Sequence, residues 1–305
     1  MSATSPKPFH MPWMPPAEIV RVEDRGEFFV RRHQHANPDA PTVMLLHGWT
    51  ASADLQFFTA YRELAEHYSF IGIDHRGHGR GMRTLDTFAF DDVADDHVAV
   101  ARQLGIEQAV LVGYSMGGPI SLTITRRHPD FVAGIVVQAT ALEWLATRRD
   151  RWQWRFLPVL GSLLRSRWYP AVLRGGLPRM IPTGHELNAV LPWLEAEIHR
   201  GDSHTITQAG WALSSFDART WARSLEVPAG SLITTKDRLV RPRKQRALAA
   251  ALGAEIRELG ADHSAPWELP GQFSSLTVEL VADVVGRSAL SGSVGTAEPR
   301  VNVAT

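Results

Sequence analysis

Short apolar runs alternate with longer segments of helical spacing in the first half of the chain. Continuously apolar runs that end in turn residues predict buried strands at Thr42–Leu46, 70–74, 109–112 and Val132–Gln138. Apolar residues at helical spacing predict helices at 53–68, 91–104 and from Pro119 to about residue 128. Strands that alternate with helices predict an α/β fold, with a mostly parallel central sheet and helices on both faces.

The pattern also predicts elements at both ends of this core. Two short strands at 17–24 and 27–33, joined by Arg25-Gly26, indicate a hairpin. Near the C-terminus, strands are expected at 230–234 and 254–259, and helices at Pro242–Leu252 and 270–285. Both ends therefore belong to the same α/β architecture.

The rhythm changes between these blocks. Strand-like runs stop, and tryptophans accumulate among prolines and arginines at Trp144, Trp152, Trp154, Trp168, Trp193 and Trp211. We interpret residues 141–216 as a helical cap or lid insertion, which divides the core into residues 1–140 and 217–287. Residues 288–305 are rich in Ser, Gly and Ala without periodicity, and we expect a disordered tail there.

Composition narrows the class of protein. The chain has 305 residues, 44% of them hydrophobic, and a formal net charge of zero, so no overall field favours nucleic acid. It contains no cysteine, which excludes disulfides and a cysteine nucleophile. The first 16 residues lack the pattern of a signal peptide, and no 18-residue apolar run is present, so we expect a cytoplasmic protein. His185, His199 and His204 lack the spacing of a metal site, and no cofactor is expected.

One glycine-rich turn is the strongest chemical signal. The segment Gly113-Tyr114-Ser115-Met116-Gly117-Gly118 follows an apolar strand and precedes a predicted helix. Serine at this G-x-S-x-G spacing suits a sharp strand-to-helix turn that exposes its hydroxyl at the sheet edge. Ser115 is therefore the candidate nucleophile.

A serine nucleophile needs a base, and the base needs an acidic residue to orient it. In open α/β sheets such groups lie on loops at the carboxyl ends of strands. Asp237 follows the strand at 230–234, and His263 follows the strand at 254–259. We expect Ser115, His263 and Asp237 to form a triad. Glu143, after the strand Val132–Gln138, is the alternative acid.

Five ordered segments resemble the α/β-hydrolase superfamily over roughly residues 17–287. They are His47-Gly48-Trp49, Asp74-His75-Arg76-Gly77-His78-Gly79, the Ser115 turn, Lys236-Asp237-Arg238-Leu239-Val240-Arg241-Pro242, and His263-Ser264-Ala265-Pro266-Trp267-Glu268-Leu269-Pro270. The resemblance implies an oxyanion hole built from the backbone N–H groups of Trp49 and Met116. Two positions depart from the family pattern: Asp262 and Thr234 stand where many members have glycine.

Other polar groups have simpler interpretations. His75 and His78 are expected to support a loop, and Asp262 to form a local hydrogen bond or raise the pKa of the neighbouring imidazole. The acidic group in the helix at 91–104 is expected to be a solvated helix start, favoured by the helix dipole.

A serine at position 115 implies acyl transfer through an acyl-enzyme. We expect a lipase-like serine esterase for small-molecule esters, with a medium or long apolar acyl chain. A carbon–carbon hydrolase, a cofactor-free haloperoxidase or perhydrolase, and a ligand receptor with little turnover stay open as alternatives. Oligomeric state is not indicated.

The insertion also carries a basic amphipathic segment. Arginines between residues 144 and 174 have Asp150 as their acidic neighbour, and Leu157, Leu160, Leu164 and Trp168 recur at helical spacing. The favoured interpretation is a cap that packs over the pocket with solvated arginines. The alternative is weak contact with an anionic membrane surface.

Overall fold

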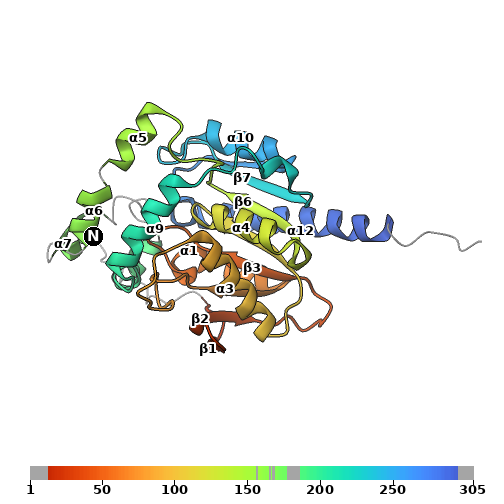
Figure 1. The fold of residues 1–305 in the computed structure, drawn as a ribbon. Helices are drawn as coiled ribbons and strands as arrows, with labels where there is room; N and C mark the ends of the chain where they lie inside the picture. Colours follow the sequence, from red (N-terminus) through yellow and green to blue (C-terminus); the bar gives the residue numbers. More distant parts are fainter. Residues whose placement is uncertain (1–12, 156, 165, 167–168, 177–185, 295–305) are drawn as a thin grey trace, which may run out of the picture.

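The computed structural model describes residues 13–155, 157–164, 166, 169–176 and 186–294 (Figure 1). Its centre is an eight-stranded sheet of order β1-β2-β4-β3-β5-β6-β7-β8. The strands are β1 Ala17–Val22, β2 Gly26–His33, β3 Thr42–Leu46, β4 Ser69–Ile73, β5 Ala109–Tyr114, β6 Val132–Gln138, β7 Ala229–Thr234 and β8 Glu255–Leu259. The β1–β2 hairpin is antiparallel and pairs with β4 in antiparallel register, and every pairing from β4 to β8 is parallel. The predicted α/β fold class is confirmed.

Helices cover both faces of this sheet. One apolar cluster joins Met44 and Leu46 of β3 to α3 Phe90–Gln103, α4 Gly117–Arg127 and α10 Pro242–Leu252. The other joins Val43 and Leu45 of the same strand to α11 Ala265–Glu268 and α12 Pro270–Val294. Successive β3 side chains therefore enter opposite layers, which is why the strand is continuously apolar.

The segment predicted as one helix at 53–68 is two short helices, α1 Ala53–Phe57 and α2 Tyr61–Ala65. All five α1 residues are buried, including Asp54, whose carboxylate is held by the Arg31 guanidinium and the Tyr61 hydroxyl. Such tertiary contacts override the local preference for a continuous helix.

The last helix is longer than expected. It extends beyond the predicted end at residue 285 to Val294, so residues 288–294 are helical where a disordered tail was predicted. A nucleated helix gains one hydrogen bond per added residue, so serines and alanines continue it. The rest of the predicted tail, 295–305, lies outside the described residues.

The described part of residues 141–216 is mainly helical. It contains α5 Arg148–Trp154, α6 Leu157–Leu164, α7 Tyr169–Gly176, η3 Glu186–Val190, α8 Leu191–Ile198 and α9 Ser203–Ser215. These helices lie at one end of the sheet (Figure 1). His185 and Trp168, with Arg165 and Arg167, lie outside the described residues. None of the described helices has the length and apolar character needed to cross a bilayer.

Candidate active site

Ser115 lies at the turn between β5 and α4 with φ of +53°, a value that L-residues rarely adopt. The turn depends on its glycines. A Cβ at Gly117 would lie 2.0 Å from the Leu46 carbonyl oxygen, and a Cβ at Gly113 would lie 2.3 Å from the Gly117 oxygen. Only glycine lets β3, β5 and α4 approach this closely, which holds the serine in its strained conformation.

The structure brings Ser115, His263 and Asp237 together. The Oγ atom of Ser115 lies 3.0 Å from Nε2 of His263, and Nδ1 of that ring lies 2.8 Å from Oδ2 of Asp237. An ionised carboxylate only accepts hydrogen bonds, so Nδ1 carries the proton and Nε2 accepts from the serine hydroxyl. This is the geometry that a general base needs.

The Asp237 carboxylate is buried and fully hydrogen-bonded. Its Oδ1 atom accepts from the backbone N–H groups of Leu239 and Val240 at 2.9 and 2.8 Å. Its Oδ2 atom accepts from the Thr234 hydroxyl at 2.8 Å and the Gln245 amide at 3.2 Å, besides the imidazole. Thr234, a departure from the family pattern, thus orients the acid directly.

Asp262, the second residue that departs from the family pattern, connects two loops of the site. One carries Asp237 and is called the acid loop; the other carries His263 and is called the histidine loop. Its Oδ1 atom accepts from the backbone N–H groups of Arg238 and His263 at 2.9 and 2.8 Å. Its Oδ2 atom pairs with the Arg238 guanidinium at 2.7 Å. Partial burial acts to raise the pKa of Asp262, but these hydrogen bonds and the arginine charge lower it overall. Sequence reasoning anticipated a local hydrogen bond but not this link between two site loops.

Glu143, the alternative acid, has different partners. Its carboxylate accepts from the backbone N–H of Ala146 at 2.8 Å and lies 3.2 Å from Nζ of Lys244. The structure therefore places Asp237, and not Glu143, against His263.

The loop after β3 approaches Ser115 closely. A Cβ at Gly48 would lie 3.3 Å from Cβ of Ser115, and the Gly48 N–H donates to the Gln56 amide oxygen at 3.3 Å. Within the described chain, neither the backbone N–H of Trp49 nor that of Met116 donates to a protein acceptor. Both groups are therefore free to bind an anionic oxygen. The Trp49 indole donates to the Ile206 carbonyl of α9 at 2.7 Å, which fixes the loop to the insertion.

A cavity of about 520 Å³ opens beside Ser115. Its walls come from the loop after β3, from α1, from the histidine loop and from α7 and α8 of the insertion. The lining is mainly apolar, with Leu55, Val172, Ile198, Pro266 and Trp267 contributing to it. Among the described lining residues none is Asp, Glu, Lys or Arg. The cavity therefore favours a neutral, apolar group.

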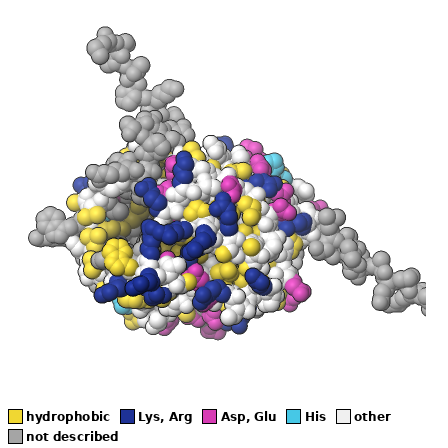
Figure 2. All heavy atoms as spheres, turned by 90° about the horizontal axis from the view of Figure 1, so that it is seen from above, with side chains coloured by type: hydrophobic (Ala, Val, Ile, Leu, Met, Phe, Trp, Pro, Cys, Tyr) yellow, Lys and Arg dark blue, Asp and Glu magenta, His cyan; other side chains and the backbone are white. Residues whose placement is uncertain are grey.

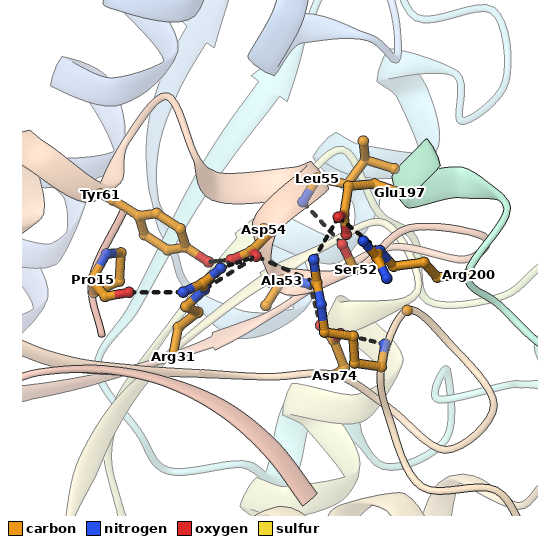
Figure 3. A network of polar contacts seen from close by, with 12 residues as sticks. Pro15, Arg31, Ser52, Ala53, Asp54, Leu55, Tyr61, Asp74, Glu197 and Arg200 are labelled. Atoms are coloured by element: carbon orange, nitrogen blue, oxygen red, sulfur yellow. Dashed lines mark hydrogen bonds and ion pairs between the residues drawn. The ribbon is translucent and has the colours of Figure 1, made fainter. Parts of the chain in front are cut away.

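A buried ionic network fixes the insertion to the core near this cavity (Figure 3). Glu197 of α8 is almost completely buried, and its Oε1 atom pairs with Arg80 at 2.5 Å and Arg200 at 2.9 Å. Arg80 also contacts the Asp54 carboxylate of α1 at 3.4 Å, and its backbone N–H donates to Asp74 at 2.8 Å. One guanidinium thus connects the insertion to the elements after β3 and β4.

Four histidines lie buried behind the loop after β3. His47 and His75 stack at 3.6 Å between ring centroids, and Nδ1 of His75 lies 2.9 Å from Nε2 of His97. Burial lowers the pKa of each ring, to about 4 for His78 and His97. These rings are neutral packing groups that support the loop. Among the described residues no group of histidines and carboxylates is arranged to hold a metal ion.

The acidic start of α3 is not simply solvated, as the sequence suggested. Asp96 is buried and pairs with Arg76 and with Arg25, the latter at 2.9 Å. Asp95 pairs with Arg127 at 2.8 Å. These carboxylates attach α3 to its neighbours, which spacing along one helix cannot reveal.

Known proteins similar to this chain in sequence or in fold are numerous. The family model for the alpha/beta hydrolase fold matches residues 41–160. The AB hydrolase superfamily protein YisY of Bacillus subtilis (strain 168) is 34% identical over 110 residues, which cover 36% of this chain and 39% of the relative. The bifunctional esterase/perhydrolase DCH of Acinetobacter calcoaceticus is 37% identical over 117 residues, which cover 37% of this chain and 41% of the relative. The chain thus spans about two fifths of the length of these curated relatives.

Among solved structures, the enol-lactonase of Burkholderia xenovorans LB400 superposes with a TM-score of 0.74 at 22% identity, covering 87% of this chain and 100% of that one. This likeness shows the fold. Residues 41–160 match the α/β-hydrolase family model, and the chain has the α/β-hydrolase fold.

Proposed function

We propose that this protein is a serine hydrolase that cleaves carboxylic esters of apolar acyl groups through an acyl-enzyme on Ser115. The observation that carries the proposal is the continuous hydrogen-bonded chain from the Ser115 hydroxyl through His263 to Asp237, beside an uncharged cavity. In this proposal the insertion acts as a cap, because α7 and α8 supply part of the cavity wall.

The reaction proceeds in two acyl transfers. Nε2 of His263 takes the Ser115 proton while Oγ forms a bond to the ester carbonyl carbon. The alcohol then leaves with that proton as the acyl C–O bond breaks. Water repeats the sequence on the acyl-enzyme: His263 removes its proton, the acid is released and the proton returns to Oγ. Asp237 keeps the imidazole in the required tautomer and stabilises its cationic form.

The carbonyl oxygen gains negative charge in both steps. The N–H groups of Trp49 and Met116 are the proposed donors to it, and such a donor typically contributes about 3 kcal/mol to transition-state stabilisation. The main chain needs no reorganisation there, because the Gln56 side chain already fixes the preceding glycine.

A chain-length series of p-nitrophenyl esters tests this function. We expect turnover with acetate through octanoate, rising with acyl length as the apolar cavity fills. The Ser115→Ala variant should lose turnover and labelling by a fluorophosphonate probe. Labelling of the wild type without turnover of any ester would instead support the ligand receptor, and no labelling at all would contradict the site.

Perhydrolysis is a second candidate, because the Acinetobacter calcoaceticus relative is described as both esterase and perhydrolase. Hydrogen peroxide would replace water in the second transfer and release a peracid. Peracid formation from acetate and peroxide, measured by oxidation of a dye and lost in Ser115→Ala, would support it.

A further inference from the structure

The outer side of α5 is basic and partly apolar. Arg148, Trp152 and Arg155 recur at i, i+4 and i+7 along this helix and the turn after it, so they share one side. Both arginines are exposed, and Trp152 is 60% exposed. A large aromatic ring between two cations is thus presented to solvent.

The inner side of α5 is fixed to the core. Asp150 accepts from Nζ of Lys244 in α10 at 2.8 Å. The Trp154 ring lies 5.7 Å from the ring of Trp49 in the proposed oxyanion loop. The helix therefore has a defined orientation, with its basic side outward and its inner side against Trp49, which lines the cavity.

The acid loop and the start of α10 extend this surface. Leu239 is 59% exposed, and Arg241 and Arg243 are exposed beside it. Lys244 holds α10 against α5, so the two segments adjoin although they are distant in sequence. We define the basic face by the residues Arg148, Arg149, Trp152, Arg155, Leu239, Arg241 and Arg243. In Figure 2, Lys and Arg side chains gather on the side of the molecule to which α5 and α10 belong.

The positive charge of the basic face is locally uncompensated. Within the described part of the chain, none of its five arginines forms an ion pair, and the nearby carboxylates of Glu143 and Asp150 are occupied by Lys244. The whole chain has zero formal net charge, so this surface is a segregated excess of cations. Exposed cations with no partner attract polyanionic surfaces.

We propose that the basic face binds the surface of an anionic lipid bilayer. Its arginines would contact lipid phosphates, while Trp152 and Leu239 would enter the interface between headgroups and acyl chains. Amphipathic aromatic rings favour this boundary, which a purely electrostatic contact with nucleic acid does not use. Docking in this way would hold α5, and through it the proposed oxyanion loop, close to apolar esters dissolved in the membrane.

Vesicle flotation with the full-length Ser115→Ala protein tests binding without turnover. Phosphatidylcholine vesicles with 30% phosphatidylglycerol should carry the protein upward at low salt, and vesicles of phosphatidylcholine alone should not. The variants Arg148→Gln/Arg149→Gln and Arg241→Gln/Arg243→Gln should each lower the partition coefficient roughly tenfold or more, because each cation near an anionic surface contributes about 1 kcal/mol. The variant Arg62→Gln/Arg102→Gln, which removes two exposed arginines elsewhere, is the matched control and should leave the partition coefficient unchanged.

Trp152 supplies an independent readout. Its emission should shift to the blue with anionic vesicles, and Trp152→Ala should lose that shift while circular dichroism stays unchanged. Equal binding to neutral vesicles, or equal losses in the control pair, would overturn the proposal. Binding to duplex DNA or to an acidic protein without binding to vesicles would also overturn it. None of these outcomes depends on esterase activity, so failure of one proposal leaves the other testable.

Discussion

At the scale of single residues, Thr234 is the clearest case of a side chain that acts through another. Its hydroxyl donates to the same Asp237 oxygen that accepts from the imidazole. We expect Thr234→Val to lower kcat roughly tenfold or more with little change in KM, because a hydrogen bond to a charged group contributes about 1.5 to 3 kcal/mol. Steady-state kinetics on a p-nitrophenyl ester measure this.

The neighbouring threonine is the control for that substitution. The hydroxyl of Thr235 bonds the Leu259 carbonyl at 3.3 Å and does not contact the acid. Thr235→Val should therefore keep wild-type kcat. Equal effects of the two substitutions would mean that Thr234 stabilises the strand and does not orient the acid.

Gly117 shows that the turn at Ser115 accepts only glycine at this position. The expected effect of Gly117→Ala is a loss of about 3 kcal/mol or more in the free energy of unfolding, since the added methyl group would collide with the Leu46 main chain. Urea unfolding followed by circular dichroism measures it. Gly286→Ala in α12 meets no atom within 4 Å and should leave stability equal or slightly higher.

At the scale of elements, the Arg80–Glu197 pair predicts energetic coupling between the insertion and the core. A double-mutant cycle with Arg80→Met and Glu197→Leu measures this coupling. We expect the double variant to lose less free energy of unfolding than the two single variants lose together, by about 1 kcal/mol or more. The exposed pair Arg246–Glu258 should show almost none, because solvent screens it. Coupling equally small in both pairs would show that α8 is not held by this contact.

The elements also show what the sequence could predict. The strands β3 and β6 were predicted with their observed bounds, because both of their faces are buried and the apolar runs are continuous. The break between α1 and α2 was missed, since it depends on Asp54 meeting Arg31 of a distant strand.

In the candidate site, too, the sequence predicted some residues and missed others. Ser115, His263 and Asp237 were predictable because each follows a recognisable strand, and such residues meet at one edge of a parallel sheet. The groups that hold them were not predicted: Gln245 of α10 donates to the acid, and Asp262 reaches Arg238 from another loop. Side-chain pairing across loops leaves no periodic signal in a single chain.

At the scale of the whole molecule, we expect stability to fall in mild acid. Burial lowers the pKa of His47, His75, His78 and His97 below the usual 6.5, to about 4 for the last two. Between about pH 6.5 and 4 the unfolded chain binds protons that the folded chain excludes, so the free energy of unfolding decreases as pH falls. Burial raises the pKa of Asp74 to about 7, so this group alone would increase the free energy of unfolding as pH falls. The four histidines outnumber it, and the net change is a decrease.

Urea unfolding at pH 7.5, 6.0 and 5.0 and constant ionic strength checks this expectation. Each excluded proton contributes up to about 1.4 kcal/mol per pH unit. Substitution of the exposed His67 by Asn should leave the slope unchanged, whereas His78→Asn should reduce it. If the urea midpoint of unfolding stayed constant across this pH range, the buried histidines could not be neutral as assigned.

The hydrogen bond from the Trp49 indole to the Ile206 carbonyl has a kinetic consequence. The main chain of this tryptophan is the proposed donor to the developing oxyanion, while its ring is anchored to α9. An ester too bulky for the cavity would press on Trp49, which lines it, and would thereby move that donor out of position. Size discrimination in this protein would then appear as slower turnover of bound substrate rather than as weaker binding.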